Sequence, residues 1–424
     1  KRPGRGELES LLDVADGYGM TMARLPRLTE FRSDEDQRIE LRPVAIEDLL
    51  GRTRTKLDRA AMRRLIEGRR VLVTGAGGSI GAELARQVAG FDPARLSLLD
   101  HSEYLLYTID MEIADSHPDL PRAAILANVR DGARLARAVA EETPELVFHA
   151  AALKHVPMVE TNPVEAVLTN AIGVRNMADA CRHGAVAEMV LISTDKAVNP
   201  TSVMGATKRL AESYCQALDI AARREGKGGT RFVTVRFGNV LGSTGSVVPL
   251  FQRQLAAGGP LTVTHPDMRR YFMTVSEAVE LVLQASALGV RAPAAEAGKI
   301  YVLDMGEPVR IMDLARHMIR LAGLRPDKDI RIQVIGPRPG EKLHEELFHE
   351  AEPLLDGGHP GLRLAAPRAA NRELLRRGLD DLEAAAAQGR TAVALATLAR
   401  LVPDYRSAAA TEKHDDTAAS ASPA

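Results

Sequence analysis

Short apolar runs alternate with longer amphipathic stretches between Arg70 and residue 237. Such runs are typical of parallel strands that are buried on both faces of a sheet. The stretches between them have the length and spacing of helices. Six strand–helix units predict an α/β protein with a doubly wound parallel Rossmann sheet. The predicted strands are Val71–Thr74, Leu96–Leu99, Ala123–Leu126, Leu146–Phe148, Met189–Ile192 and Phe232–Phe237.

The pattern also predicts how the chain is divided. Residues before Arg70 contain only an amphipathic stretch at Ile46–Leu50 and a charged, helix-like run at Lys56–Arg70. After residue 240, glycine and proline become dense, and two helical stretches stand among them, Val275–Leu288 and Ile311–Leu321. We expect a lead-in at 1–68, the Rossmann domain at 69–240, a small substrate-binding region at 241–350, a helical region at 351–406 and a disordered tail at 407–424.

Composition and charge narrow the function. The net charge is −1 and only 15 of the 424 residues are aromatic, which argues against a nucleic-acid partner. Two cysteines, Cys181 and Cys215, are too few for a disulfide framework and favour a reducing compartment. No cluster has metal-ligand spacing, so we expect no metal. No stretch is long and apolar enough to span a bilayer, and the basic start at Lys1 suggests a soluble fragment of a longer protein.

A glycine loop follows the first predicted strand. Gly75-Ala-Gly-Gly-Ser-Ile-Gly81 joins that strand to a helical stretch, an arrangement in which glycines admit a pyrophosphate close to the backbone and the helix N-terminus binds it. Asp100 ends the next strand, 19 residues after Gly81, where an acid that binds a ribose hydroxyl belongs. This carboxylate would repel a 2′-phosphate, so the sequence favours NAD over NADP as the cofactor.

A second polar cluster, Ser193-Thr-Asp-Lys196, ends the strand Met189–Ile192. Ligands and catalytic groups collect at such strand ends in open α/β sheets. A hydroxyl, a carboxylate and an amine in succession offer a hydrogen-bond donor, an acid and a base. Eight residues later, Met204 and Lys208 are spaced four apart, which places them on one helix face.

These motifs resemble those of the extended short-chain dehydrogenases/reductases, in which a Tyr-x-x-x-Lys pair takes the place of Met204 and Lys208. The chain is more closely similar to the nucleotide-sugar 4,6-dehydratases of polysaccharide biosynthesis. Methionine in place of tyrosine resembles the large, membrane-anchored branch that acts on UDP-N-acetylglucosamine. The resemblance covers about two-thirds of the chain. It rests on Val71–Gly81, His149–Pro157, Ser193–Val198, Asn199–Thr201, Met204–Arg209, Arg236–Gly242, Gly245–Phe251, Arg270–Thr274 and Arg338–Lys342.

The resemblance implies a redox-neutral dehydration of a UDP-sugar. Bound NAD takes a hydride from sugar C4, the C5 proton and C6 hydroxyl are eliminated, and the hydride returns to C6. Lys196 is expected as the C5 base, Asp195 as the acid for the C6 hydroxyl and Thr194 as the partner of the C4 hydroxyl. Met204 cannot ionise, so the group that takes the C4 hydroxyl proton is left open, and Lys208 is expected to hold the nicotinamide ribose.

The resemblance also implies binding residues. For NAD these are Gly75, Gly78, Ser79, Ile80, Gly81, Asp100, Asn128, Val129, Ala150, Ala151 and Lys208. For the UDP-sugar, Arg270 and Arg338 are expected at the pyrophosphate, Glu341 at the uridine ribose, and Lys154, Asn239 and Ser246 along the sugar and diphosphate; His149, His155 and His265 are expected to be structural.

Several alternatives stay open. A dehydratase that inverts C5 differs only in product stereochemistry, a 4-epimerase would normally keep the tyrosine, and an NAD-binding protein without turnover would not need the acid–base set. The resemblance further implies a homo-oligomer. It also implies that the lead-in at 1–68 is the remnant of a nucleotide-binding-like domain, and that the full-length protein lies at the cytoplasmic face of the inner membrane through an N-terminal segment that this chain lacks.

Overall fold

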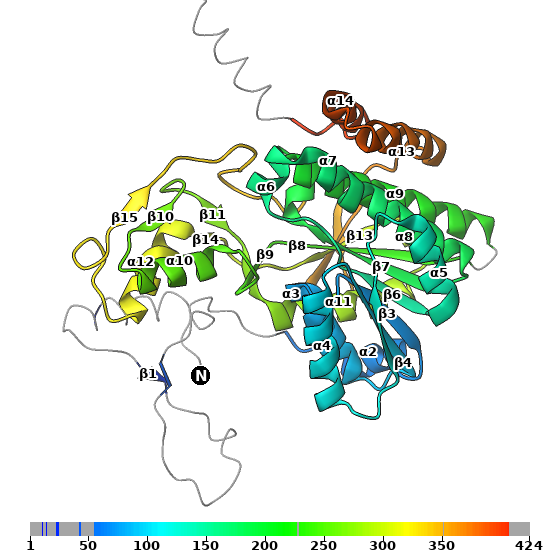
Figure 1. Ribbon diagram of the computed structural model, residues 1–424, viewed down its shortest axis with the longest axis horizontal. Coiled ribbons are helices and arrows are strands. Elements are labelled where there is room, and N and C mark those ends of the chain that lie inside the picture. Colours follow the sequence, from blue (N-terminus) through cyan, green and yellow to red (C-terminus); the bar gives the residue numbers. More distant parts are fainter. Residues whose placement is uncertain are drawn as a thin grey trace, which may run out of the picture. The chain divides into compact units, whose positions relative to one another are not determined.

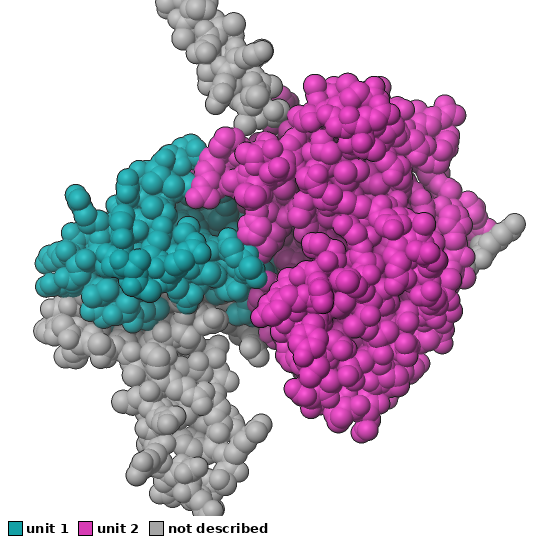
Figure 2. All heavy atoms as spheres, viewed as in Figure 1, with its two compact units in different colours: residues 1–54, 239–274, 305–337 teal, residues 55–238, 275–304, 338–424 magenta. Residues whose placement is uncertain are grey.

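The computed structural model describes residues 55–226, 229–350 and 352–406, together with a few positions before residue 55. The chain forms two units, which Figure 2 distinguishes by colour. The larger one, here called the sheet unit, contains Thr55–Gly238, Val275–Asp304 and Arg338–Ala424; the small unit contains Lys1–Arg54, Asn239–Thr274 and Met305–Pro337. The expected amphipathic stretch at Ile46–Leu50 and the expected tail at 407–424 lie outside the described residues.

A nine-stranded sheet forms the centre of the sheet unit (Figure 1). Across the sheet the order is β16 (Leu354–Asp356), β17 (Leu362–Ala365), β13 (Ile300–Leu303), β8 (Arg231–Phe237), β7 (Glu188–Thr194), β6 (Leu146–His149), β3 (Arg70–Thr74), β4 (Arg95–Asp100) and β5 (Arg122–Leu126). The strands from β13 to β5 are parallel, and β17 is antiparallel to both of its neighbours, β13 and β16. The chain order reverses between β3 and β6, the point at which open parallel sheets bind their ligands.

Helices cover both faces of this sheet (Figure 1). On one face lie α2 (Arg59–Ile66), α3 (Ser79–Ala89), α4 (Glu103–Ser116) and α11 (Val275–Gly289). On the other lie α5 (Gly132–Glu142), α8 (Gly173–His183) and α9 (Val203–Glu225), with α6 (Val156–Thr161), α7 (Pro163–Ala166) and the π-helical turn η3 (Val167–Ile172) beside them. Short 3₁₀ turns are η4 (Asp195–Ala197) and η5 (Ala294–Glu296). Polar side chains cap the N-termini of several helices. Ser202 Oγ, for example, accepts a hydrogen bond from the backbone N–H of Gly205 at the start of α9 (3.1 Å).

The C-terminal helices complete one layer of the sheet unit. Helices α13 (Arg372–Ala387) and α14 (Thr391–Leu401) pack on each other and against α9. Their apolar side chains, including Leu379, Leu382 and Leu398, are buried in the same core as the residues of α5, α8 and α9. The expected C-terminal helical region is therefore an integral part of the sheet unit's packing.

The small unit has short strands around its own apolar core. Strand β9 (Asn239–Leu241) pairs with β12 (Phe272–Thr274), β10 (Leu261–Val263) with β15 (Ile332–Val334), β11 (Arg269–Arg270) with β14 (Val309–Arg310), and β1 (Ala23–Arg24) with β2 (Arg42–Pro43). Helices α10 (Val247–Ala256) and α12 (Ile311–Leu321) pack beside β10. Phe251, Leu261 and Ile319 are fully buried in this core.

The predicted α/β class and all six predicted strands are confirmed. The sheet is larger than predicted because β13, β16 and β17 extend it with residues from beyond position 240. As a result, the expected substrate-binding region at 241–350 is not one piece: residues 275–304 and 338–350 fold with the sheet unit. Among the described residues, no helix is both long and apolar enough to cross a membrane.

Candidate active site

The glycine loop lies between the end of β3 and the start of α3. Gly75 has φ +66°, a left-handed conformation that favours glycine, and a Cβ there would lie only 2.6 Å from the backbone N of Ala151. A Cβ on Gly81 would overlap the carbonyl oxygen of Gly75. Gly78 caps α3 and donates its N–H to the same carbonyl (3.0 Å). The loop is therefore pressed onto the end of β6, and the helix N-terminus, with Ser79 and Ile80 in its first turn, lies at this edge of the sheet, where it suits a pyrophosphate.

Asp100 ends β4 at the same edge and is almost fully buried. Its carboxylate accepts hydrogen bonds from the backbone N of Gly77 (2.9 Å) and of Ser102 (2.9 Å). These bonds hold the carboxylate beside the glycine loop, and each oxygen has a further lone pair with which to accept a ribose hydroxyl. The donors and acceptors at this edge therefore fit the adenosine half of NAD.

The other expected cofactor residues follow the neighbouring strands. Asn128 is exposed and Val129 is buried directly after β5, and Asn128 Oδ1 accepts the N–H of Arg130 (3.0 Å). Ala150 and Ala151 follow β6, where Ala150 donates its N–H to the carbonyl oxygen at the end of β3 (3.1 Å). The structure thus brings the expected NAD-binding residues of β3 to β6 together at the carboxyl edge of the sheet.

The acid–base cluster follows β7 on the same edge. Thr194 Oγ1 donates to Asp195 Oδ1 (2.8 Å), and Lys196 Nζ donates to that same oxygen (2.9 Å). Asp195 is completely buried, and its second oxygen, Oδ2, has no hydrogen-bond partner among the described residues. One carboxylate oxygen therefore links the hydroxyl to the amine, and the other is left for a further proton donor.

Met204 and Lys208 lie on α9, as their spacing predicted. Met204 is buried in the apolar core of the sheet unit. Lys208 is 5% exposed and its Nζ donates to the carbonyl oxygen of Ile192 (2.5 Å). Burial lowers the pKa of Lys208 to about 8, although the charge of Glu212 opposes this shift. The amine is thus held at Ile192, the residue of β7 that comes directly before the cluster Ser193–Lys196.

The three histidines noted in the sequence, His149, His155 and His265, lie at separate places in the structure. His149 is fully buried at the end of β6, its Nδ1 lies 2.9 Å from Thr74 Oγ1, and burial together with the charge of Lys208 lowers its pKa to about 3. His155 is exposed beside α6, and His265 Nδ1 accepts the N–H of Asp267 within the small unit (3.0 Å). In the described ranges, no three His, Cys, Asp or Glu side chains are grouped to hold a metal ion. Cys181 and Cys215 are buried thiols.

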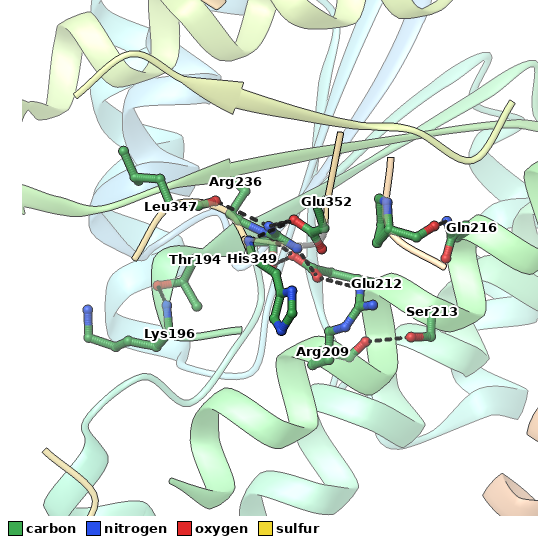
Figure 3. Close-up of polar contacts among 12 residues, drawn as sticks. Thr194, Lys196, Arg209, Glu212, Ser213, Gln216, Arg236, Leu347, His349 and Glu352 are labelled. Atoms are coloured by element: carbon green, nitrogen blue, oxygen red, sulfur yellow. Dashed lines mark hydrogen bonds and ion pairs between the residues drawn. The ribbon is translucent and has the colours of Figure 1, made fainter. Parts of the chain in front are cut away.

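A buried network of ion pairs contacts the acid–base cluster, and Figure 3 shows its side chains. Glu212 on α9 and Arg236 on β8 are both fully buried, with Arg236 Nη2 2.8 Å and Nε 3.1 Å from the Glu212 carboxylate. Glu212 also accepts the hydroxyl of Ser193 (2.6 Å), the residue before Thr194. Arg236 reaches Glu352 as well (3.2 Å). The network thereby ties β7, β8, α9 and the segment before β16 together at the catalytic edge.

The expected substrate-binding residues fall in both units. In the small unit, Asn239 begins β9, Ser246 caps α10, and Arg270 is 7% exposed in β11, with Nη1 donating to its neighbour's carbonyl (2.7 Å). In the sheet unit, Lys154 is exposed after β6. Arg338 is also exposed, and its backbone N donates to Glu341 Oε2 (3.2 Å), so Glu341 closes its own turn. Their roles toward a substrate stay predictions.

Sequence reasoning missed one residue of the site, Glu345. This glutamate is 8% exposed, and its Oε1 lies 3.7 Å from Lys196 Nζ. It follows the matched stretch Arg338–Lys342 by three residues, so that stretch could have drawn attention to it. Its contact with Lys196 depends on the tertiary fold, for which the sequence carries no local signal.

Together, the parallel sheet with its reversal between β3 and β6, the glycine loop and the strand-end cluster define a Rossmann protein of the extended short-chain dehydrogenase/reductase type. Residues 71–364 match the family model described as "Polysaccharide biosynthesis protein". The chain belongs to this family.

Individual relatives support the same placement. The chain is 48% identical to the capsular polysaccharide biosynthesis protein CapD of Staphylococcus aureus, over 81% of this chain and 56% of that protein. It is 32% identical to a UDP-N-acetylglucosamine 4,6-dehydratase (inverting) of Campylobacter jejuni, over 67% of this chain and 78% of the relative. The Thermus thermophilus UDP-glucose 4-epimerase, solved with NAD, is 25% identical with a TM-score of 0.52, covering 66% of this chain and 90% of that one.

The chain spans less than two thirds of the length of two curated relatives that it matches. It spans 56% of the length of CapD and 61% of the length of the probable polysaccharide biosynthesis protein EpsC of Bacillus subtilis, to which it is 42% identical over 88% of this chain. The chain therefore matches only part of each of these relatives.

Proposed function

We propose that this chain is a UDP-N-acetylglucosamine 4,6-dehydratase that carries NAD and makes a UDP-4-keto-6-deoxy-N-acetylhexosamine for a surface polysaccharide. The observation that carries this proposal is the chain of contacts Thr194–Asp195–Lys196, in which a hydroxyl and an amine share one buried carboxylate oxygen. An epimerase, which neither breaks the C5–H bond nor expels the C6 hydroxyl, has no use for such a set. The 32% identity to a protein named for this activity supports the proposal.

The chain's own residues suit NAD at the sheet edge. The glycine loop and the start of α3 would bind its pyrophosphate, Asp100 its adenosine ribose and Lys208 its nicotinamide ribose. When bound, NAD supplies the acceptor for the C4 hydride and later the donor of that hydride to C6. The bond from Lys208 Nζ to Ile192 holds the amine in place for this contact.

The proton of the C4 hydroxyl can leave through Thr194. Its hydroxyl already donates to Asp195 Oδ1, so it can accept the C4 proton with a free lone pair while its own proton passes to the carboxylate. This path needs no tyrosine, and it accounts for an apolar Met204 where relatives carry one. Asp195 ends the step as a carboxylic acid, the form required to protonate the departing C6 hydroxyl.

Lys196 then takes the C5 proton. The 4-ketone makes this proton acidic, and a neutral amine in a buried site is a competent general base. As the C5–H bond breaks, its electron pair forms the C5=C6 double bond and the C6 hydroxyl leaves as water with the proton of Asp195. When the hydride reaches C6, the ammonium of Lys196 returns a proton to C5. The net change is the loss of one water.

The test is to incubate the purified chain with UDP-N-acetylglucosamine and no added cofactor. A product lighter by one water, with a new C6 methyl signal in the proton NMR spectrum, is the expected result. The coupling at C5 distinguishes retention from inversion of that centre. Unchanged substrate, even with NAD supplied, would overturn the proposal.

A further inference from the structure

Glu345 places a second buried carboxylate beside the catalytic amine. Its Oε1 lies 3.7 Å from Lys196 Nζ, although Glu345 and Lys196 lie far apart in the sequence. Its side chain is 3% exposed and that of Lys196 is 20% exposed. Charged groups that face Lys196 include Asp195, Glu345 and, from the loop after β6, Lys154, whose pKa is lowered by partial desolvation and then by the charge of Lys196.

Contacts before and after Glu345 hold its segment to the rest of the sheet unit. Before it, Lys342 Nζ donates to the carbonyl oxygen of Val198 (2.7 Å). After it, Glu346 accepts the side-chain amide of Asn199 (2.8 Å), and Glu352 pairs with Arg236. The first two contacts hold the backbone around Glu345 against Val198 and Asn199, and the third holds it to β8, so its place beside Lys196 is built into the fold.

The proposed dehydration needs an acceptor for the proton that Lys196 carries at rest. If Lys196 rests as an ammonium paired with Asp195, it must lose that proton before it can remove the one on C5. Asp195 cannot accept it, because the carboxylate is receiving the C4 proton by way of Thr194. A second carboxylate within reach of Nζ would resolve this conflict.

We propose that Glu345 is a positioning residue that holds Nζ of Lys196 and stores its proton during each turnover. This rests on the proposed function. The Lys196 ammonium gives a proton to the Glu345 carboxylate, leaving a neutral amine and a carboxylic acid. Lys196 then takes the C5 proton and later returns it to C5, after which Glu345 gives its proton back. Nζ has to approach Oε1 by about 1 Å to reach hydrogen-bond distance, a side-chain adjustment only.

The predicted signature is in the pH dependence of kcat. With Glu345 in place, the proton stays in the site and kcat is flat around neutral pH. In Glu345→Gln the proton has to leave to solvent, so kcat gains a pH dependence that the parent lacks and rises about tenfold per pH unit until the amine is neutral, with KM nearly unchanged. Glu345→Asp keeps a carboxylate and should restore the flat profile at a reduced rate.

Glu350→Gln is the matched control, because Glu350 is an exposed glutamate in the same segment. It should behave as the parent does. If Glu345→Gln matches this control in both rate and pH profile, the inference is overturned.

A second readout does not need turnover. The reactivity of the Lys196 amine toward acetic anhydride, followed against pH by peptide mass spectrometry, reports directly on loss of its proton. Removing the nearby charge should shift the onset of labelling to lower pH by about one unit or more in Glu345→Gln and leave it unchanged in Glu350→Gln. An unshifted onset refutes the role of Glu345 even in a chain that converts no sugar. A parent that is inactive but shows the shift would refute only the proposed function.

Discussion

Replacing Glu212 by glutamine should destabilise the sheet unit far more than the loss of an ordinary ion pair. Glu212 and Arg236 are both fully buried, and the change removes the carboxylate that accepts two hydrogen bonds from Arg236, leaving Glu352, 3.2 Å away, as its remaining acidic partner. Breaking a buried pair by removing one partner costs about 3–5 kcal/mol. With an m value of about 3 kcal/mol/M, the urea midpoint should fall by about 1 to 1.7 M.

The surface pair of Arg86 with Glu112 gives the control. Both side chains are more than 40% exposed, so Glu112→Gln should change stability by about 1 kcal/mol or less. Urea unfolding followed by far-ultraviolet circular dichroism measures both variants against the parent. Equal midpoints for Glu212→Gln and Glu112→Gln would refute the reasoning that the buried network holds β7 and α9 together.

Three further predictions concern the site. Gly75→Ala should weaken NAD binding more than tenfold in calorimetry, because the new Cβ meets Ala151, whereas Gly389→Ala, with nearly the same φ and open space around it, should not. Lys208→Met should remove a gain in stability that the parent shows between about pH 8 and 10. The pKa of Lys208 is about 8 in the folded chain and 10.5 for an ordinary lysine, so in that window the unfolded chain binds more protons than the folded one. In urea titrations, the free energy of unfolding of the parent should therefore rise by up to about 3 kcal/mol relative to that of the variant. Asp195→Asn should retain NAD but lose dehydration, and full activity would contradict its role as the acid.

The strands and the glycine loop could be predicted because their signals are local. Continuous apolar runs mark strands buried on both faces, and the six predicted runs all form parallel strands. Strand β13 is as apolar as the six predicted strands. It has only four residues and follows a stretch rich in small loop residues, so the sequence pattern does not identify it as a strand. The exposed strand β16 has only three residues, too few to show a pattern from which to predict it.

The placement of Thr194, Asp195 and Lys196 at the end of β7 could be predicted for the same reason, since they are consecutive in sequence; their acid–base roles stay predictions. What the sequence could not indicate were contacts made only by folding. Arg236 and Glu212 are charged residues, which a sequence pattern predicts to be exposed. Both are buried in the structure, because each forms an ion pair with the other. Glu345 reaches Lys196 from a segment anchored by Lys342 and Glu352, and only the tertiary structure brings it there.

The most direct test of the central claim follows a hydrogen atom through the reaction. UDP-N-acetylglucosamine carrying deuterium at C4 is incubated with the purified chain, and the product is analysed by mass spectrometry and NMR. The proposed dehydration predicts loss of one water and deuterium in the C6 methyl group, because the hydride leaves C4 and returns at C6. Deuterium that remains at C4, or a product that still holds its C6 hydroxyl, would contradict a 4,6-dehydratase.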